Sequence, residues 1–260
     1  MQSMANTTTE PIIVVLTVTS VESKAVFAAF LGREGKKKHM TEKGVTYQDL
    51  GLHSGQRIIH VKSEMGSMAS AFRTGDAIRS WKPKACIAVG IAFGMDDKKQ
   101  NMGDVLVSRQ MQEYDFSRVN DCGTLTPRGD KVSCSDVLVS RLRATSDDTT
   151  TTTKVHFGLM LSGSKLIDCE DYRQNLKSLF EEAIGGEMEG SGLYQSAVHA
   201  NTDWAVIKAI CDWGDGNKGE SKEANQNLAA KNAACFLKDA LDLGGPLYKN
   251  DDQRTKYLNI

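Results

Sequence analysis

Residues 11–31, PIIVVLTVTSVESKAVFAAFL, place a short apolar run directly before a stretch with helical spacing. The run at 11–18 is rich in β-branched residues and uninterrupted, as in a strand that is buried on both faces. The apolar residues of 20–31 recur at helical intervals. The segment therefore predicts a strand followed by a helix, which is the repeating unit of an α/β sheet.

The same alternation continues along the chain to residue 243. Further strands are predicted at 57–63, 84–92, 103–112, 154–163 and 204–213, and further helices at 67–81, 135–144, 169–183 and 222–243. This order favours an α/β sheet covered on both faces. Four prolines, no linker and no repeat favour one domain at 11–243, between a flexible segment at 1–10 and a polar tail at 244–260.

Composition argues against several classes of function. The 32 Lys and Arg residues against 33 Asp and Glu residues give no electrostatic case for nucleic acid or an anionic membrane surface. No apolar run has the length of a membrane span, and the first ten residues are too polar for a signal peptide. The six cysteines and five histidines lack the spacing of disulfide or metal sites, so we expect a cytoplasmic protein without metal or cofactor.

Acidic residues follow the ends of three predicted strands, where ligands bind in α/β sheets. Glu22 comes shortly after the first strand, and Asp212 ends the strand AVIKAIC. Glu187 and Glu189 flank Met188 in the motif GGEMEGSGLY. In an extended chain the two glutamates share one side and the methionine takes the other. Glutamates at a strand end can also simply point to water, and Asp is a common turn or N-cap residue.

Four motifs resemble, in their order, those of the purine nucleoside phosphorylase and nucleosidase superfamily. They are AVGIAFGMDDKKQNMGDVLVS from residue 88, LMLSGSKLI from 159, GGEMEGSGLY from 185 and VIKAICDWGD from 206. The variants GIAFG, GEMEGSGLY and ICDWGDGNK look most like a branch found as effector domains in immune proteins, including nucleosidases that act on ATP. The resemblance implies a single-domain, three-layer α/β/α fold with a mixed central sheet, in a homo-oligomer that is a dimer or a hexamer.

The resemblance also implies roles for the acidic residues. Cleaving a purine N-glycosidic bond requires a neutral leaving base and a stabilised ribose cation. Asp212, beside Trp213, matches the general acid that protonates N7 of the base. Glu189 matches the carboxylate that binds the 2′ and 3′ hydroxyls and stabilises the oxocarbenium ion. Met188 is expected against the sugar, and Glu187 is expected to support the site.

Glu22 fits two roles. The spacing Thr19-x-x-Glu22 is that of a capping box at a helix start, which is purely structural. In hydrolytic members of the superfamily, an acid near this position activates the attacking water. Both interpretations stay open at the level of the sequence.

The base and phosphate sites depart from the pattern of the superfamily. Leu166 and Ile167 stand where relatives use an apolar or aromatic residue against the base, and Ser164 replaces the usual Asp. Trp213 is a candidate to compensate for the missing ring. Phosphorylases bind phosphate through a Ser in the glycine turn and through Arg residues, but Ile91 stands at the Ser position and no Arg precedes it. Hydrolysis is therefore favoured over phosphorolysis.

A nucleotide substrate requires cations for its phosphates. Candidates on predicted loops or strand ends are Arg109, Arg118, Arg128, Lys131 and Lys165, although ordinary surface cations have the same appearance. The leading hypothesis is a purine nucleosidase acting on adenine nucleotides, ATP or dATP, with an immune role implied by the resemblance. The alternatives are a methylthioadenosine/adenosylhomocysteine-type nucleosidase, a purine nucleoside phosphorylase, and a catalytically inactive nucleotide-binding module.

Overall fold

The computed structural model describes residues 10–32, 39–42, 44–148, 153–217, 219 and 221–248. Its first unit is strand β1 (Ile12–Thr17) followed by helix α1 (Ser20–Leu31), as the opening segment of the sequence predicts. Residues 1–9 of the predicted flexible segment and residues 249–260 of the predicted polar tail lie outside the described residues.

The central sheet is mixed, as expected, and has ten strands in the order β11-β10-β6-β12-β5-β1-β4-β3-β2, with β9 paired to β6. Strand β12 runs parallel to β5 and antiparallel to β6. The bounds of the strands other than β1 are β2 (His39–Glu42), β3 (Val45–His53), β4 (Gln56–Lys62), β5 (Ala85–Gly94), β6 (Val105–Glu113), β9 (Val132–Ser133), β10 (Val155–Ser162), β11 (Ala183–Glu187) and β12 (Asp203–Asp212).

Strand β11 closes one half of the sheet on itself. It pairs with β10 in parallel and also with β5 in antiparallel, through Gly185 opposite Gly94 and Gly186 opposite Phe93. A Cβ at Gly186 would lie 2.4 Å from the Phe93 ring, and one at Gly185 would lie 2.6 Å from the Phe93 carbonyl oxygen. Glycine at both positions therefore permits the close approach of β11 to β5, and this approach brings the end of β11 to the middle of the sheet.

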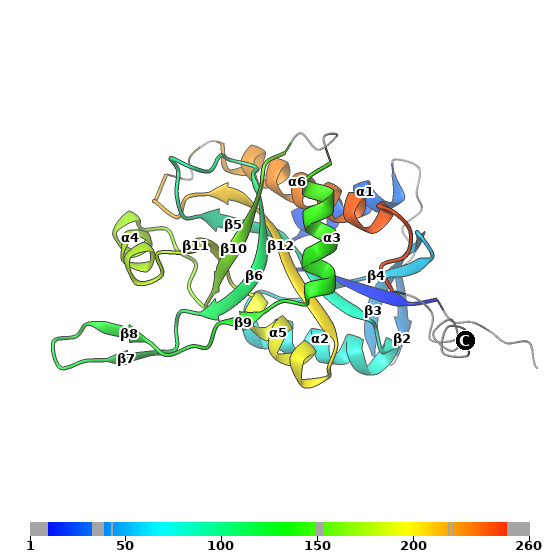
Figure 1. The fold of residues 1–260 in the computed structure, drawn as a ribbon, viewed down its shortest axis with the longest axis horizontal. Helices are drawn as coiled ribbons and strands as arrows, with labels where there is room; N and C mark the ends of the chain where they lie inside the picture. The colour runs from blue at the N-terminus through cyan, green and yellow to red at the C-terminus, as the bar shows by residue number, and fades with distance from the viewer. Residues whose placement is uncertain are drawn as a thin grey trace, which may run out of the picture.

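Helices cover both faces of the sheet and give three layers (Figure 1). Helices α1, α3 (Asp136–Ser146) and α6 (Lys222–Asp242) pack on one face, and α2 (Ser67–Trp81) and α5 (Gly190–His199) pack together on the other. The α/β/α architecture predicted from the sequence is confirmed. None of the described helices combines the length and the apolar character that a membrane span requires.

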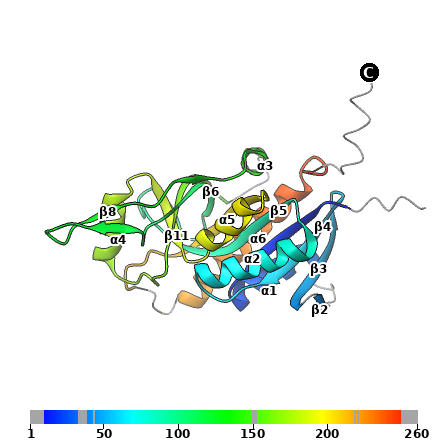
Figure 2. The same ribbon diagram turned by 90° about the horizontal axis from the view of Figure 1, so that it is seen from below.

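Two features differ from the predicted elements. Helix α4 (Glu170–Leu179) ends before residue 183, because Phe180 turns into the core, where it is 5% exposed, and the chain enters β11. The sequence patterns missed the β2–β3 hairpin and a second hairpin of β7 (Ser117–Val119) and β8 (Leu125–Pro127). The β7–β8 hairpin projects from the body of the molecule (Figures 1 and 2). β2, β7 and β8 are only three or four residues long, and the nine-residue β3 alternates apolar with polar residues, so none of them has the apolar run that marks a buried strand.

The contact between α2 and α5 depends on Gly192. A Cβ at this position would lie 1.8 Å from the carbonyl oxygen of Ser67. We expect Gly192→Ala to force the two helices apart and to lower the free energy of unfolding by about 1–3 kcal/mol, measured by urea denaturation. The matched control is Gly75→Ala in α2, where a new Cβ meets only the end of the Arg79 side chain at 3.3 Å. That variant should be unchanged or more stable, because alanine favours a helix by about 0.5–1 kcal/mol over glycine. Equal stability of the two variants would contradict the assigned packing.

Candidate active site

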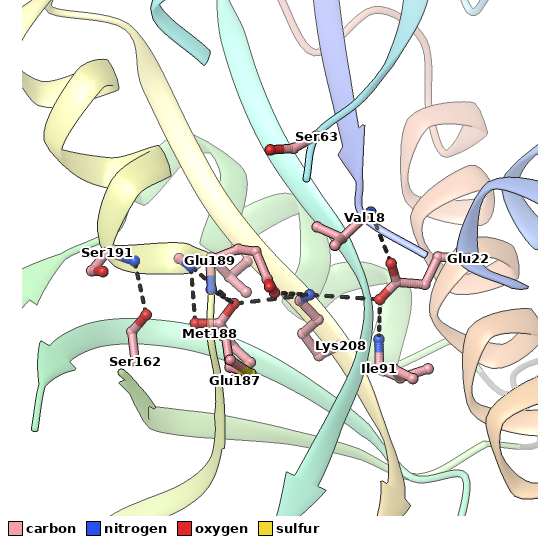
Figure 3. A network of polar contacts seen from close by, with 12 residues as sticks. Val18, Glu22, Ser63, Ile91, Ser162, Glu187, Met188, Glu189, Ser191 and Lys208 are labelled. Carbon is pink, nitrogen blue, oxygen red and sulfur yellow. Dashed lines mark hydrogen bonds and ion pairs between the residues drawn. The ribbon is translucent and has the colours of Figure 1, made fainter. Parts of the chain in front are cut away.

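Lys208 lies within β12 with 1% of its surface exposed, and three carboxylates surround its ammonium group (Figure 3). Its Nζ lies 3.3 Å from Glu189 Oε2, 3.7 Å from Glu22 Oε1 and 3.8 Å from Glu187 Oε2. Burial alone would lower the pKa of this amine, but the three carboxylates outweigh burial and raise it. Lys208 is therefore a charged counter-ion that ties together three segments distant in sequence.

Glu22 is held from both sides by backbone N–H groups. Its Oε2 accepts hydrogen bonds from Val18 N (2.9 Å) and Thr19 N (2.7 Å), and its Oε1 accepts one from Ile91 N (2.9 Å). The Thr19 side chain accepts from Glu22 N at 3.2 Å, so the expected capping box is present. A Cβ at Gly90 would lie 1.8 Å from Glu22 Oε1, so only glycine lets the carboxylate reach β5. The same carboxylate caps α1 and faces the pocket described below.

Glu187 is the last residue of β11 and holds the turn into α5. Its carboxylate accepts hydrogen bonds from the N–H groups of Glu189 and Gly190, each at 2.9 Å. Burial raises the pKa of Glu187. Its oxygens are occupied by the backbone and by Lys208, which agrees with a supporting position.

Glu189 leaves the extended conformation and becomes the N-cap residue of α5, with φ −120° and ψ −27°. The expectation that Glu187 and Glu189 share one side of an extended chain is therefore wrong, because the strand ends between them. They meet instead because the chain turns around Lys208. Glu189 Oε1 also accepts a hydrogen bond from Gly66 N at 3.2 Å, which ties it to the β4–α2 connection.

Asp212 ends β12 and begins a tight turn. Its Oδ1 accepts a hydrogen bond from Gly214 N at 2.9 Å, and Cys211 Sγ donates to its Oδ2 at 3.3 Å. The bond to Gly214 is that of an Asx turn, so the turn role weighed from the sequence is present. The carboxylate nevertheless faces the same pocket as Glu22 and Glu189.

A pocket with a volume of about 230 Å³ brings these groups together. Many of the sequence-predicted site residues line it: Glu22, Ile91, Leu166, Ile167, Glu187, Met188, Glu189 and Asp212. Ile91, Ala92 and Phe93 form an apolar wall of the pocket. Lys165, Lys222 and Gln226 add polar groups to the lining, of which only Lys165 was considered from the sequence.

Five predicted substrate-binding residues do not line this pocket, and one of them, Arg118, lies in β7. Trp213 packs on Gly94, where a Cβ would lie 2.4 Å from its ring, and it lines a separate small cavity with Asp212. Arg109 lines another cavity, beside Cys134 and Arg143. Arg128 follows the β8 strand, and Lys131 forms an ion pair with Glu182. The reason is topological: the segment from Arg109 to Lys131 runs along β6 and through the projecting hairpin instead of around the pocket.

Asp115 holds the loop that borders the pocket beside the predicted base site. Its Oδ2 accepts from Ser164 N at 2.6 Å and from Ser164 Oγ at 2.7 Å, and it forms an ion pair with Lys165. Burial alone would raise the pKa of Asp115. The hydrogen bonds from Lys165 and Ser164 and the charge of Lys165 outweigh burial, so the pKa of Asp115 is lowered. Position 164 carries Ser in place of the Asp that is usual in the superfamily. The carboxylate of Asp115 nevertheless lies against this position.

Besides Lys222 and Gln226, the sequence interpretation missed two residues that hold the site together: Lys208 and Asp115. The signal for Lys208 was a lysine inside the apolar strand AVIKAIC, since a fully buried lysine requires carboxylate partners. No local pattern marks Asp115. Among the residues that the structure describes, no three His, Cys, Asp or Glu side chains are grouped so that they could hold a metal ion.

Comparison with known proteins gives one family match and several relatives. A family model described as the phosphorylase superfamily matches residues 12–242. A death domain-containing ATP nucleosidase from Amphimedon queenslandica is 31% identical over 221 residues, which cover 76% of this chain and 39% of that protein. This chain therefore spans well under half the length of that relative. A 5′-methylthioadenosine/S-adenosylhomocysteine nucleosidase from Staphylococcus aureus is 27% identical over 183 residues, covering 69% of this chain and 79% of that protein.

Solved structures share the fold. A 5′-methylthioadenosine/S-adenosylhomocysteine nucleosidase from Neisseria meningitidis aligns with a TM-score of 0.75 at 19% identity, over 89% of this chain and 98% of that chain. A futalosine hydrolase from Helicobacter pylori aligns with a TM-score of 0.76 at 20% identity, over 89% and 97% of the two chains.

The charge of Lys208 can be tested through the pH dependence of stability. In Lys208→Met the three carboxylates lose their counter-ion, and we expect a loss of about 3–5 kcal/mol of unfolding free energy at neutral pH. The pKa of Glu187, which burial already raises, then rises further because the charge of Lys208 no longer lowers it. A carboxyl group whose pKa is raised in the folded state lowers the free energy of unfolding as pH rises from its unfolded pKa toward its folded pKa. The loss of unfolding free energy in Lys208→Met should therefore grow as pH rises from about 4. Urea denaturation at about pH 5 and about pH 8 measures this slope.

Lys208→Arg is the control for this experiment, because it keeps the positive charge at the same position in β12. Its stability should follow the pH dependence of the wild type more closely than that of Lys208→Met. If Lys208→Met matched the wild type at both pH values, the ammonium group would not be the counter-ion of the cluster.

Proposed function

Because the chain belongs to the phosphorylase superfamily, we propose that it is a purine nucleosidase that hydrolyses the N-glycosidic bond of adenine nucleotides. The substrate is ATP or dATP, and the products are adenine and the (deoxy)ribose 5′-triphosphate. The observation that carries this proposal is the presence of Glu22, Glu189 and Asp212 on one pocket, with a buried ammonium behind two of them.

In the proposed reaction each carboxylate has one task. Asp212 donates a proton to N7 as the C1′–N9 bond breaks, so that the electron pair leaves with a neutral base. Glu189 binds the ribose hydroxyls and stabilises the positive charge that develops on the sugar. Water attacks C1′, and Glu22 accepts its proton. Lys208 places a positive charge 3.7 Å from Glu22 and 3.3 Å from Glu189, and this counter-charge holds the two carboxylates in position.

Water is favoured over phosphate as the nucleophile. Binding a phosphate nucleophile inside the pocket requires desolvated cationic or hydrogen-bonding groups near the glycine turn. Ile91, Ala92 and Phe93 present apolar side chains there, and Ile91 N already donates to Glu22. Two lysines line the pocket. Lys165 is paired with Asp115, and Lys222 comes from the start of α6 and not from the glycine turn. Phosphorolysis therefore lacks a matching site in the lining.

The nucleotide substrate is supported by two observations. The first is the similarity to a protein that is itself an ATP nucleosidase. The second is that the lining contains the cation Lys222 and the amide Gln226, polar groups that suit a charged nucleotide better than a methylthio nucleoside. The similarity to a 5′-methylthioadenosine/S-adenosylhomocysteine nucleosidase keeps that smaller substrate class as the second candidate. An immune effector role, a cytoplasmic location and a homo-oligomeric state are parts of the same proposal.

Product analysis distinguishes the two substrate classes. Purified protein is incubated with ATP, dATP, AMP, adenosine or methylthioadenosine, with and without inorganic phosphate, and released adenine is quantified by chromatography. We expect adenine from ATP or dATP, the triphosphate intact on the sugar, and no dependence on phosphate. Efficient cleavage of methylthioadenosine without cleavage of ATP would favour the second candidate. Dependence on phosphate would exclude hydrolysis.

Asp212→Asn tests the general acid. Asparagine keeps the size of the side chain and an oxygen for Gly214 N but cannot supply a proton. We expect turnover to fall by roughly two to four orders of magnitude, with little change in substrate affinity. Single-turnover kinetics and equilibrium binding separate the two quantities. Near-normal turnover would remove Asp212 from the mechanism.

The two roles of Glu22 can be separated with a pair of variants. Glu22→Gln keeps one oxygen for the capping box, but it cannot accept the proton of water and removes one counter-charge of Lys208. Turnover and melting temperature should therefore both fall, and turnover should fall much more than in a variant of equal stability loss. Thr19→Ala removes the cap, which costs about 1 kcal/mol, while Ile91 N and Lys208 still hold Glu22. That variant should keep most of its turnover. The opposite result, with activity following Thr19 and not Glu22, would make Glu22 a structural cap only.

A further inference from the structure

A second cavity, with a volume of about 430 Å³, opens beside the first turns of α1. Its walls come from α1, from β2, β3 and β4, and from α2, and of these elements α1 also lines the catalytic pocket, through Glu22. Three cationic side chains line it: Lys24 from α1, Lys62 at the end of β4, and Arg73 from α2. One carboxylate, Glu64, shares the lining.

The charge of this cavity is positive and largely uncompensated. Three cations against one carboxylate leave two positive charges on its walls. Among the residues that the structure describes, Lys24, Lys62 and Arg73 form no ion pair, and Lys62 Nζ donates only to Ser20 Oγ at 3.2 Å. Arg73 is half-buried, which limits its access to competing water. Cations gathered without anionic partners repel one another, so a bound anion would stabilise this arrangement.

His60, on the floor of the cavity, responds to the same positive surroundings. Its Nε2 lies 2.7 Å from Thr17 Oγ1, and its ring contacts Phe27 edge-on. Burial, together with the nearby His39 and Lys62, lowers the pKa of His60 to about 3. The imidazole is therefore neutral at physiological pH. It adds a polar, uncharged surface below the three cations.

The cavity adjoins the sugar side of the catalytic pocket. Thr19 and Met65 line the pocket, and their chain neighbours Ser20 and Glu64 line the cavity. Gly66 follows Met65, and its N–H donates to the carboxylate of Glu189, the proposed ribose ligand. Asp212 and Ile167, the proposed base site, line the pocket but not the cavity. A substituent on C5′ that points away from the base would therefore leave the pocket toward the cavity.

We propose that this cavity binds the outer phosphates of the nucleotide substrate, an assignment that rests on the proposed function above. The ligand class is a 5′-polyphosphate. Arg73 offers a planar group that binds phosphate oxygens in pairs, and Lys24 and Lys62 offer point charges. The cavity then determines which adenine compounds are cleaved efficiently, while the carboxylates around Lys208 perform the cleavage.

The test compares ATP with adenosine in one double variant, Lys62→Met with Arg73→Met. None of the proposed catalytic groups is altered in this variant. We expect KM for ATP to rise about ten- to a hundredfold, which corresponds to about 1.4–2.8 kcal/mol of lost binding free energy for the two cations together. Cleavage of adenosine should stay within about twofold of the wild type, because adenosine has no phosphate. The matched control is Arg79→Met, which removes an exposed cation from the same helix, outside the cavity.

Each outcome bears on one of the two proposals. Loss of ATP cleavage alone supports the cavity assignment. Equal losses for ATP and adenosine, or no loss for either, overturn it while the nucleosidase activity stands. If the wild type releases adenine from neither compound, the proposed function fails. Calorimetric titration with inorganic tripolyphosphate then tests the cavity by itself: binding that the double variant has lost supports an anion site, and equal or absent binding overturns it.

Tripolyphosphate also distinguishes the substrate tail from a separate effector anion. If the cavity holds the tail, tripolyphosphate competes with ATP and leaves adenosine cleavage unchanged. If tripolyphosphate changes the cleavage of adenosine as well, the anion acts as an effector and the assignment to the substrate is wrong.

Discussion

A buried ammonium group must find its counter-charges inside the protein, and this requirement at Lys208 organises the site. The three glutamates around it come from the start of α1, the end of β11 and the start of α5. Hydrogen bonds with the backbone also fix these segments. Glu22 caps α1, and Glu187 holds the turn that places Glu189. The charge cluster and the chain path therefore stabilise each other. Removing one partner leaves buried charge without compensation, so the arrangement tolerates little variation.

The balance of this cluster also suits a cationic transition state. Three carboxylates against one ammonium leave excess negative charge when all are ionised, and burial of Glu187 favours its protonated form. Glu189 and Glu22 face the pocket, where that negative potential is felt across a wall that is otherwise apolar. A developing oxocarbenium ion is stabilised by fixed charges that need no reorganisation. Ile91 stands at the position where phosphorylases have a phosphate-binding Ser. Its backbone N–H also orients the Glu22 carboxylate through a hydrogen bond.

The sequence predicted the strand–helix alternation, the mixed three-layer fold and the strand ends where the acids lie, because apolar periodicity and motif order are local signals. Charges brought together by tertiary structure were harder to predict. Lys208 was visible in an apolar strand, but its partners depend on β11 closing onto β5. Arg109, Arg128 and Lys131 carry the right charge for phosphate, yet they follow β6 and the projecting hairpin away from the pocket. The cations of the second cavity come from α1, β4 and α2, and no sequence spacing links them.

The closure of β11 onto β5 also changes how the sheet meets other chains. An open sheet has two rims of unpaired backbone groups, and such rims invite another strand to add on. Here β11 has partners on both sides, β10 and β5. In the described part of the chain, the path of the sheet therefore runs out at one outer strand, β2, with four residues (His39–Glu42). The glycines that let β11 approach β5 thus also remove one rim of the central sheet.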